Sequence, residues 1–162
     1  MTAPRFTVLI ASAALAMTAT FAPAADGAAS ELTSVEIWQA DKTTVFDAQG
    51  IVLEDFLWIA RPVVVFADTP ADPAFQQQLE LLQERVDELA ARDVVIITDT
   101  SRSDISEVRR KLRPRGFMLT LIGKDGGVKL RKPFPWDVRE LTRSIDKMPL
   151  RRQEIRDSAS DN

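Results

Sequence analysis

Residues 62–67, Pro-Val-Val-Val-Phe-Ala, form an unbroken apolar run that decides the fold of this chain. Residues 93–98, Asp-Val-Val-Ile-Ile-Thr, repeat the same pattern. A continuous run of β-branched residues without polar alternation is typical of a strand that is buried on both faces. The two runs therefore predict central strands of a sheet that helices cover on both sides.

The segment between these runs has the period of a helix. Asp72 provides an N-cap and Pro73 occupies the first helical position, where proline is well tolerated. Apolar residues then recur at spacings of three and four, which predicts one helix with a single buried stripe: Phe75, Leu79, Leu82, Val86 and Leu89. Strand, helix and strand together form a βαβ unit, which requires a parallel pair with a right-handed crossover.

A shorter helix is expected after the second strand. Ser103 or Asp104 would cap it, and Pro114 would stop it because proline cannot continue a helix. Its inner face would hold Ile105, Val108 and Leu112. Basic residues gather on and after this helix, where they suit an anionic ligand or simply a solvated helix end: Arg109, Arg110, Lys111, Arg113 and Arg115.

Two further strands and a last helix complete the pattern. Residues 117–122 and 128–131 predict an antiparallel hairpin whose turn contains Asp-Gly-Gly at 125–127. That turn lacks the strand, loop and helix context of a phosphate-binding loop. The last helix is expected to end at Pro149, with an apolar face that holds Trp136, Val138, Leu141, Ile145 and Met148.

Weaker signals flank this region. Residues 25–58 form an N-terminal segment that can add strands, with 44–46 leading through a turn to a returning strand at 51–53. We expect the folded domain to occupy residues 59–150. The charged tail, residues 151–162, is expected to fray.

The first 24 residues are typical of a signal peptide. Arg5 is their only charge, an apolar stretch follows, and Ala22-Pro23-Ala24 supplies small residues where signal peptidase reads. We expect cleavage after Ala24, localisation in the periplasm and no stable membrane insertion afterwards. A membrane anchor retained at the uncleaved N-terminus is the alternative, although the many small residues and Pro23 weigh against it.

Composition excludes several functions. The chain contains no cysteine, so thiol–disulfide exchange, which needs a thiolate, is ruled out. It contains no histidine, which removes the commonest general base and metal ligand, and we expect no cofactor and no metal. A net charge of −3 argues against nucleic-acid binding.

The order β-α-β-α-β-β-α, a central mixed sheet flanked by helices, resembles the thioredoxin fold over residues 61–148. Where thioredoxins carry Cys-Gly-Pro-Cys, this chain has Ala71-Asp72-Pro73-Ala74. Met118, in an Arg-Gly-Phe-Met-Leu stretch, stands where their cis-proline would be. The resemblance therefore implies the scaffold without its redox centre.

A closer resemblance rests on the hairpin sequence at 121–131, Leu-Ile-Gly-Lys-Asp-Gly-Gly-Val-Lys-Leu-Arg, and on Met-Pro-Leu-Arg-Arg-Gln-Glu at 148–154. Both are similar to the family of exported bacterial proteins described as domain of unknown function 4174. That resemblance covers nearly all of the chain after about residue 53. It implies a thioredoxin-like fold and brings no established activity.

Candidate site residues lie at two places. Asp68, Asp72 and Asp99 follow strands or begin a helix, so they would form an acid–base or cation site, or merely cap helices and loops. The binding candidates at that end of the scaffold are Asp68, Ala71, Asp72, Pro73, Phe117 and Met118. A second pair, Arg151 and Arg152, would fork onto a partner's carboxylates or onto Glu140 or Asp146 of the same domain.

One aromatic corner remains open. Phe134, Pro135 and Trp136 would anchor a protein contact if exposed, or pack under the last helix.

We therefore expect a redox-inactive thioredoxin-like domain of the bacterial cell envelope, a protein- or ligand-binding accessory module with an unidentified protein partner in the periplasm. The alternatives are a carboxylate- or cation-dependent enzyme centred on Asp68, Asp72 and Asp99, and a structural protein of the envelope.

Overall fold

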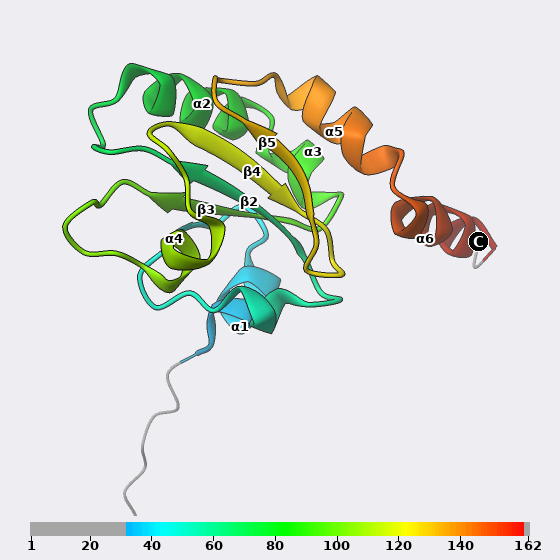
Figure 1. The fold of residues 1–162 in the computed structure, drawn as a ribbon. Coiled ribbons are helices and arrows are strands. Elements are labelled where there is room, and N and C mark those ends of the chain that lie inside the picture. The colour runs from blue at the N-terminus through cyan, green and yellow to red at the C-terminus, as the bar shows by residue number, and fades with distance from the viewer. Residues whose placement is uncertain (1–31, 161–162) are drawn as a thin grey trace, which may run out of the picture. The chain divides into compact units, whose positions relative to one another are not determined.

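The computed structural model describes residues 32–160, so the expected signal peptide lies outside the described residues. Five strands form one mixed sheet in the order β1-β3-β2-β4-β5 (Figure 1). Their bounds are β1 (Val45–Asp47), β2 (Arg61–Phe66), β3 (Val94–Asp99), β4 (Met118–Ile122) and β5 (Val128–Lys132).

Strand β2 lies at the centre of this sheet. It runs parallel to β3, with Val64 opposite Ile97, and antiparallel to β4, with Phe66 opposite Met118. Strand β5 returns antiparallel to β4, as the hairpin sequence predicts. This order and these directions confirm the predicted α/β, thioredoxin-like fold class.

The N-terminal segment differs from the expectation of a hairpin. Strand β1 pairs in parallel with β3, so it adds an edge strand to the same sheet. The predicted returning strand at 51–53 is wrong, because Leu53–Phe56 form a 3₁₀ helix, η1. A helix without an expected counterpart, α1 (Ser34–Ala40), precedes β1 and is held by a capping box between Thr33 and Glu36.

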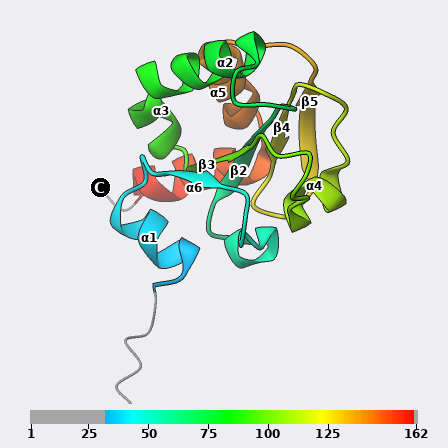
Figure 2. The same ribbon diagram turned by 90° about the vertical axis from the view of Figure 1, so that its left-hand side faces the viewer.

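Helices cover both faces of the sheet (Figure 2). Helices α2 (Pro73–Glu84), α3 (Val86–Ala90) and α5 (Val138–Asp146) cover one face, and α1, η1 and α4 (Glu107–Leu112) cover the other. Strand β2 supplies both cores, since Val63 and Val65 face one layer while Val64 and Phe66 face the other. Burial on both faces is what the apolar run at 62–67 requires.

Two predicted helices have different ends in the structure. The helix after β2 breaks at Arg85, whose backbone leaves the helical region, although Phe75 and Leu89 are both buried as expected. The cap of α4 is Ser106, not Ser103 or Asp104, because the Ser106 hydroxyl accepts from the backbone N–H of Arg109. Ile105 therefore lies before the helix and is exposed.

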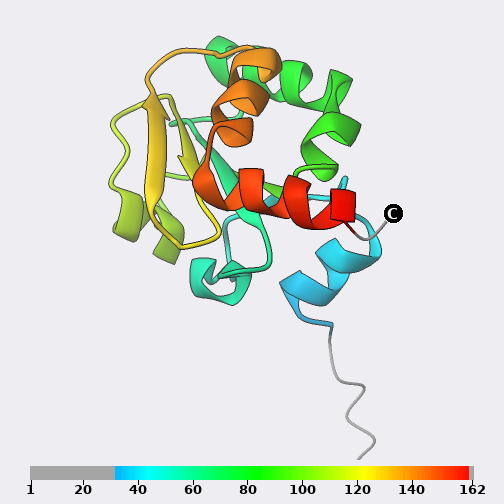
Figure 3. The ribbon, with the colours of Figure 1, turned by 90° about the vertical axis from the view of Figure 1, so that its right-hand side faces the viewer.

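The C-terminal segment is helical. Pro149 does not end a helix but begins α6 (Pro149–Ser160), consistent with the tolerance of the first helical position for proline. The charged tail is ordered as α6 through Ser160 instead of fraying, although none of its residues is fully buried. Figure 3 shows α6 running beside the sheet between α5 and α1.

A buried amide fixes the aromatic corner. The side chain of Gln78, which is fully buried in α2, accepts from the backbone N–H of Trp136 at 2.7 Å and donates to its carbonyl at 3.1 Å. Trp136 packs against the core, whereas Phe134 stays exposed. The Lys132 ammonium lies 3.9 Å from the centroid of the Trp136 ring. Trp136 thus packs into the domain as one of the two predictions has it, and a protein contact through Phe134 stays a prediction.

Within residues 32–160, no helix combines the length and the apolar character needed to cross a bilayer.

Candidate functional site

The end of the sheet that bears the redox centre in thioredoxins carries a helix cap here. The Asp72 carboxylate accepts from the backbone N–H of Ala74 at 2.8 Å and of Phe75 at 3.2 Å. Ala71 and Pro73 flank it and are exposed. These two residues present no group that can act as a nucleophile, acid or base.

Asp99 ends β3 beneath a buried cluster of charges. Its carboxylate accepts from the Ser106 hydroxyl at 2.6 Å and from the Arg109 guanidinium at 2.8 Å. The same guanidinium donates to the carbonyl of Ala67 and lies 5.4 Å from the centroid of the Phe66 ring. Arg109 is therefore mostly buried and paired, although the sequence places it in a basic surface cluster.

Asp68 lies beside this cluster. Its carboxylate is 3.3 Å from Arg102 and 4.0 Å from Arg109. Asp68 and Asp99 thus both contact Arg109, while Asp72 caps the N-terminus of α2. Among the described residues, no group of three or more acidic side chains is arranged to hold a metal ion.

Phe117 and Met118 lie at the same end of the sheet as Asp72, as the sequence predicts. Met118 pairs with Phe66, and its sulfur lies 3.6 Å from the guanidinium of Arg131. Both Phe117 and Met118 are half-buried and pack against the cores.

Arg151 and Arg152 lie away from that end, on α6. Arg151 donates to Glu154 and to the carbonyl of Ala91, both at 3.2 Å, and its Nε lies 3.8 Å from Asp146. Of the two acids within the domain considered for this pair, Asp146 is the one that Arg151 reaches. Arg152 is exposed and makes no such contact among the described residues.

An ion-pair network joins α6 to the start of β2, at the opposite end of the sheet. Arg61 is only 1% exposed, and its guanidinium donates to Glu154 at 2.8 Å and to the carbonyl of Arg92 at 2.9 Å. The Lys124 ammonium bridges Glu154, at 3.0 Å, and Asp93, at 2.8 Å. A buried charge without a partner is costly, and Glu154 is the partner of the buried Arg61 guanidinium. Glu154 is therefore part of the folded structure.

The two carboxylates of this network have lowered pKa values. Burial raises the pKa of Glu154, but hydrogen bonds from Arg61, Lys124 and Arg151 outweigh it, so the pKa lies below its ordinary value. Burial likewise acts to raise the pKa of Asp93, and bonds from Lys124 and Lys42 lower it by more. Both groups are held as carboxylates at neutral pH.

Trp58 lies beside this network in an unusual conformation. Its φ is +62°, in the left-handed region that bulky side chains rarely adopt, and its backbone N–H donates to the carbonyl of Lys124 at 2.8 Å. The hydrogen bond fixes the loop against the hairpin turn. Trp58 as a residue is 68% exposed, so burial does not explain the strain.

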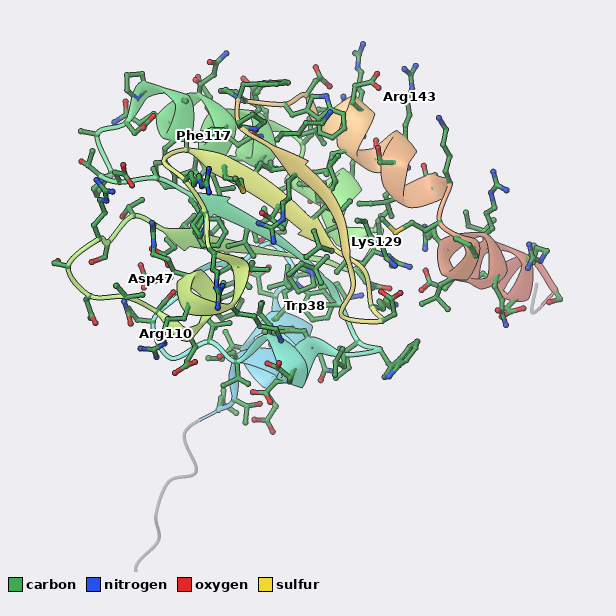
Figure 4. The ribbon with its side chains drawn as sticks, in the orientation of Figure 1. Trp38, Asp47, Arg110, Phe117, Lys129 and Arg143 are labelled. Carbon is green, nitrogen blue, oxygen red and sulfur yellow. The ribbon has the colours of Figure 1, made fainter. Side chains whose placement is uncertain are left out.

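A pocket of about 320 Å³ opens next to this indole and falls at the small end of the range for ligand sites. Its walls come from Trp58 and from the junction of α5 and α6, residues 148–150. Its remaining lining comes from Arg61, the turn at 123–125 and Lys129. Figure 4 shows Lys129 near the hairpin turn and Phe117 toward the other end of the sheet.

A second hollow, of about 230 Å³, shares Gly123 of the same turn and is below the usual size of ligand sites. Leu57, Gly126 and Val128 line it, and Leu57 and Val128 are also exposed. We call the surface formed by Leu57, Trp58, Val128 and the Trp58 pocket the hairpin-end face. Leu57, Trp58 and Val128 are exposed apolar residues in or next to the loop and hairpin turn that the Trp58–Lys124 hydrogen bond joins.

Sequence patterns did not find this face. The one local signal is Arg61, a charged residue at the start of a strand that is otherwise wholly apolar, which points to a distant carboxylate partner. Nothing in the sequence around Trp58 indicates a left-handed backbone, which is more often found at glycine or asparagine.

Comparisons with known proteins assign a family to most of the chain. Residues 52–154 match the family described as domain of unknown function 4174. Coiled-coil domain-containing protein 80 of Danio rerio is 31% identical over 133 residues, which covers 64% of this chain and 15% of that protein. The chain thus spans less than a fifth of the length of that relative.

Solved structures of peroxiredoxins are also similar. Prx1a of Plasmodium yoelii is 17% identical with a TM-score of 0.47, covering 59% of this chain and 77% of that one. The mitochondrial 2-Cys peroxiredoxin from Plasmodium falciparum is 18% identical with a TM-score of 0.43, covering 59% and 79%.

Proposed function

Because the chain belongs to the family described as domain of unknown function 4174, whose description states no activity, we propose a function from its own surface. It is a redox-inactive, thioredoxin-like binding module of the bacterial cell envelope, and its ligand contacts the hairpin-end face.

One observation carries this proposal: Trp58 is strained and exposed beside a pocket. A left-handed backbone at a bulky residue costs about 1–2 kcal/mol, and only packing or function repays such a cost. A backbone hydrogen bond to the carbonyl of Lys124 holds this conformation, but the side chain itself packs little, because Trp58 is mostly exposed. The orientation instead places a large flat apolar group at the mouth of a pocket, where it is ready to contact a ligand.

The other end of the sheet gives less support for function. Without cysteine it has no thiolate, so it cannot exchange disulfides. Asp72 is engaged by backbone amides, and Asp68 and Asp99 are engaged by arginines. A carboxylate enzyme would need at least one of these groups free to move a proton, so the binding role is the better supported one.

Export is the second part of the proposal. It is supported by the charged start, the apolar middle and the small residues that end at Ala24. The mass of the chain recovered from the periplasm tests it. A mature chain that begins at Ala25 is expected, whereas an intact chain retained in the cytoplasm would contradict export.

Photo-crosslinking in intact cells tests the contact surface. A photoreactive benzoylphenylalanine in place of Trp58 keeps an aromatic group at the pocket, and the matched control carries it in place of Ile105, which is exposed on another loop. We expect an adduct, whether small or macromolecular, at position 58 only. Leu150→Glu, which puts a charge into the pocket wall, is expected to abolish that adduct.

Equal adduct formation at positions 58 and 105, or an adduct that persists with Leu150→Glu, would remove the hairpin-end face from the proposal. Turnover of a small substrate that is lost in Asp72→Asn, a change that keeps the helix cap, would replace the binding role with an enzymatic one.

A further inference from the structure

The pocket beside Trp58 combines apolar walls with positive charge. Trp58, Met148, Pro149 and Leu150 form the walls. We propose that this pocket binds a small organic acid, one carboxylate on an apolar body. The inference rests on the proposed function, because it names the ligand of the hairpin-end face.

The charges that line the pocket favour an anion. Arg61, Lys124 and Lys129 are cationic, and Asp125 is the one carboxylate among the lining residues of this pocket. Glu154 and Asp93, which pair with Arg61 and Lys124, do not line the pocket, so the lining itself has an excess of two cations over carboxylates. A ligand that brings one negative charge would reduce it.

Hydrogen-bond donors remain available on Lys129. A lysine ammonium has three N–H groups. Lys124 contacts two carboxylates, Asp93 and Glu154, and Lys129 contacts one, Asp125, at 2.6 Å. The Lys129 side chain is 35% exposed, so its two remaining donors can turn toward a ligand in the pocket.

Two of the cations that line the pocket already bind a carboxylate of the protein. Arg61 and Lys124 both donate to Glu154, at 2.8 and 3.0 Å, next to the pocket. Charge-assisted hydrogen bonds of this kind are among the strongest available for recognising a carboxylate. The contacts proposed for the ligand's carboxylate are therefore of the same kind as those that Arg61 and Lys124 make with the carboxylate of Glu154.

Size decides in favour of a small ligand. A pocket of about 320 Å³ lies at the lower limit for small-molecule sites. The exposed Trp58 ring can stack on an aromatic or alicyclic body while the carboxylate reaches Lys129.

Nuclear magnetic resonance of the ¹⁵N-labelled chain tests the inference. The chain has three tryptophans, so three indole N–H signals report on it. 4-Phenylbutyrate is the probe, and 4-phenylbutyramide is its neutral counterpart. We expect phenylbutyrate to shift the Trp58 signal saturably, and the amide to bind about tenfold more weakly or worse.

Matched lysine variants locate the charge. Lys129→Met is expected to weaken phenylbutyrate binding about tenfold, since it removes a charge-assisted hydrogen bond. Lys147→Met is the control, because Lys147 is exposed and does not line the pocket. The affinity of the Lys147→Met variant for phenylbutyrate is expected to match that of the unmodified chain.

Equal binding of acid and amide, or an equal loss in both lysine variants, would overturn the inference. So would tighter binding of an acetylated Gly-Gly-Phe peptide with a free carboxyl end, which would assign the pocket to a protein terminus. If phenylbutyrate fails to bind while crosslinks form at position 58, the small-acid inference falls and the binding module stands. If both fail, the hairpin-end face is not the site.

Discussion

The carboxylate of Glu154, in the last helix, accepts a hydrogen bond at 2.8 Å from the guanidinium of Arg61, the first residue of the central strand. The two residues are 93 positions apart in the chain. Arg61 is almost completely buried, and Lys124 binds the same carboxylate. This contact makes α6 part of the folded domain, although its own side chains bury little surface.

Removing the charge of Glu154 should loosen that attachment. Glu154→Gln keeps the size and one acceptor oxygen but leaves Arg61 without its counter-charge. We expect the free energy of unfolding in urea to fall by about 1.5–3 kcal/mol, the range for hydrogen bonds to charged groups. Hydrogen exchange should also speed up in α6.

Glu140→Gln is the matched control for this change. Glu140 pairs with Arg143 on the exposed face of α5, where ion pairs contribute about 0–1 kcal/mol. Equal destabilisation by the two substitutions would contradict a structural role for the Arg61–Glu154 pair.

Stability should also depend on pH through this network. The pKa values of Glu154 and Asp93 are lower in the folded chain than their ordinary values. The unfolded chain therefore binds more protons than the folded chain as the pH falls through the ordinary carboxyl range. The stabilisation is complete above about pH 5 and is lost as the pH falls through the folded pKa values.

Urea denaturation from pH 7 to pH 3 measures this dependence. We expect Glu154→Gln to lose less stability over this range than the unmodified chain, because one of the shifted groups is gone. If the two chains lost equal stability over that interval, Glu154 would not be a source of the dependence.

Asp72 should act as a helix cap. Asp72→Ala removes the acceptor for the N–H groups of Ala74 and Phe75, so we expect a loss of about 1 kcal/mol. Asp72→Asn should cost much less, because asparagine caps helices about equally well. Thermal unfolding of the two variants checks this order, and equal losses would mean that the charge, and not the cap, matters.

The stabilities of glycine and alanine variants at position 58 should show that the backbone of Trp58 is strained. Trp58→Gly and Trp58→Ala both remove the indole, but only glycine adopts a positive φ without cost. We expect the glycine variant to be more stable than the alanine variant by about 1 kcal/mol. At the neighbouring Leu57, where φ is −56°, alanine should be the more stable of the two.

Urea denaturation of these four variants measures both differences. If alanine were preferred at position 58 as well, the left-handed conformation would be in doubt, and with it the argument that the conformation serves binding.

The sheet and most helices could be predicted because their signals are local. The apolar runs at 62–67 and 93–98 place β2 and β3, and the spacing from Phe75 to Leu89 places the helical segment between them. The capping box of Thr33 and Glu36 was a readable signal for α1. The break at Arg85 has no counterpart in the apolar spacing.

The binding face could not be predicted because it depends on contacts between distant segments. Trp58 owes its place to a hydrogen bond from its backbone N–H to Lys124, 66 positions later, and the pocket needs Pro149 from the α5–α6 junction. The thioredoxin resemblance instead indicates Asp72 and Met118, at the other end of the sheet. Their place in the fold was correct, and their role in binding stays a prediction.

The most direct measurement is a comparison of photo-crosslinking at the two ends of the sheet in intact cells. One chain carries benzoylphenylalanine in place of Trp58, and the other carries it in place of Phe117. Our account predicts an adduct at position 58 that exceeds the one at position 117. A dominant adduct at position 117, with none at 58, would return the binding site to the vacated thioredoxin end and contradict the central claim.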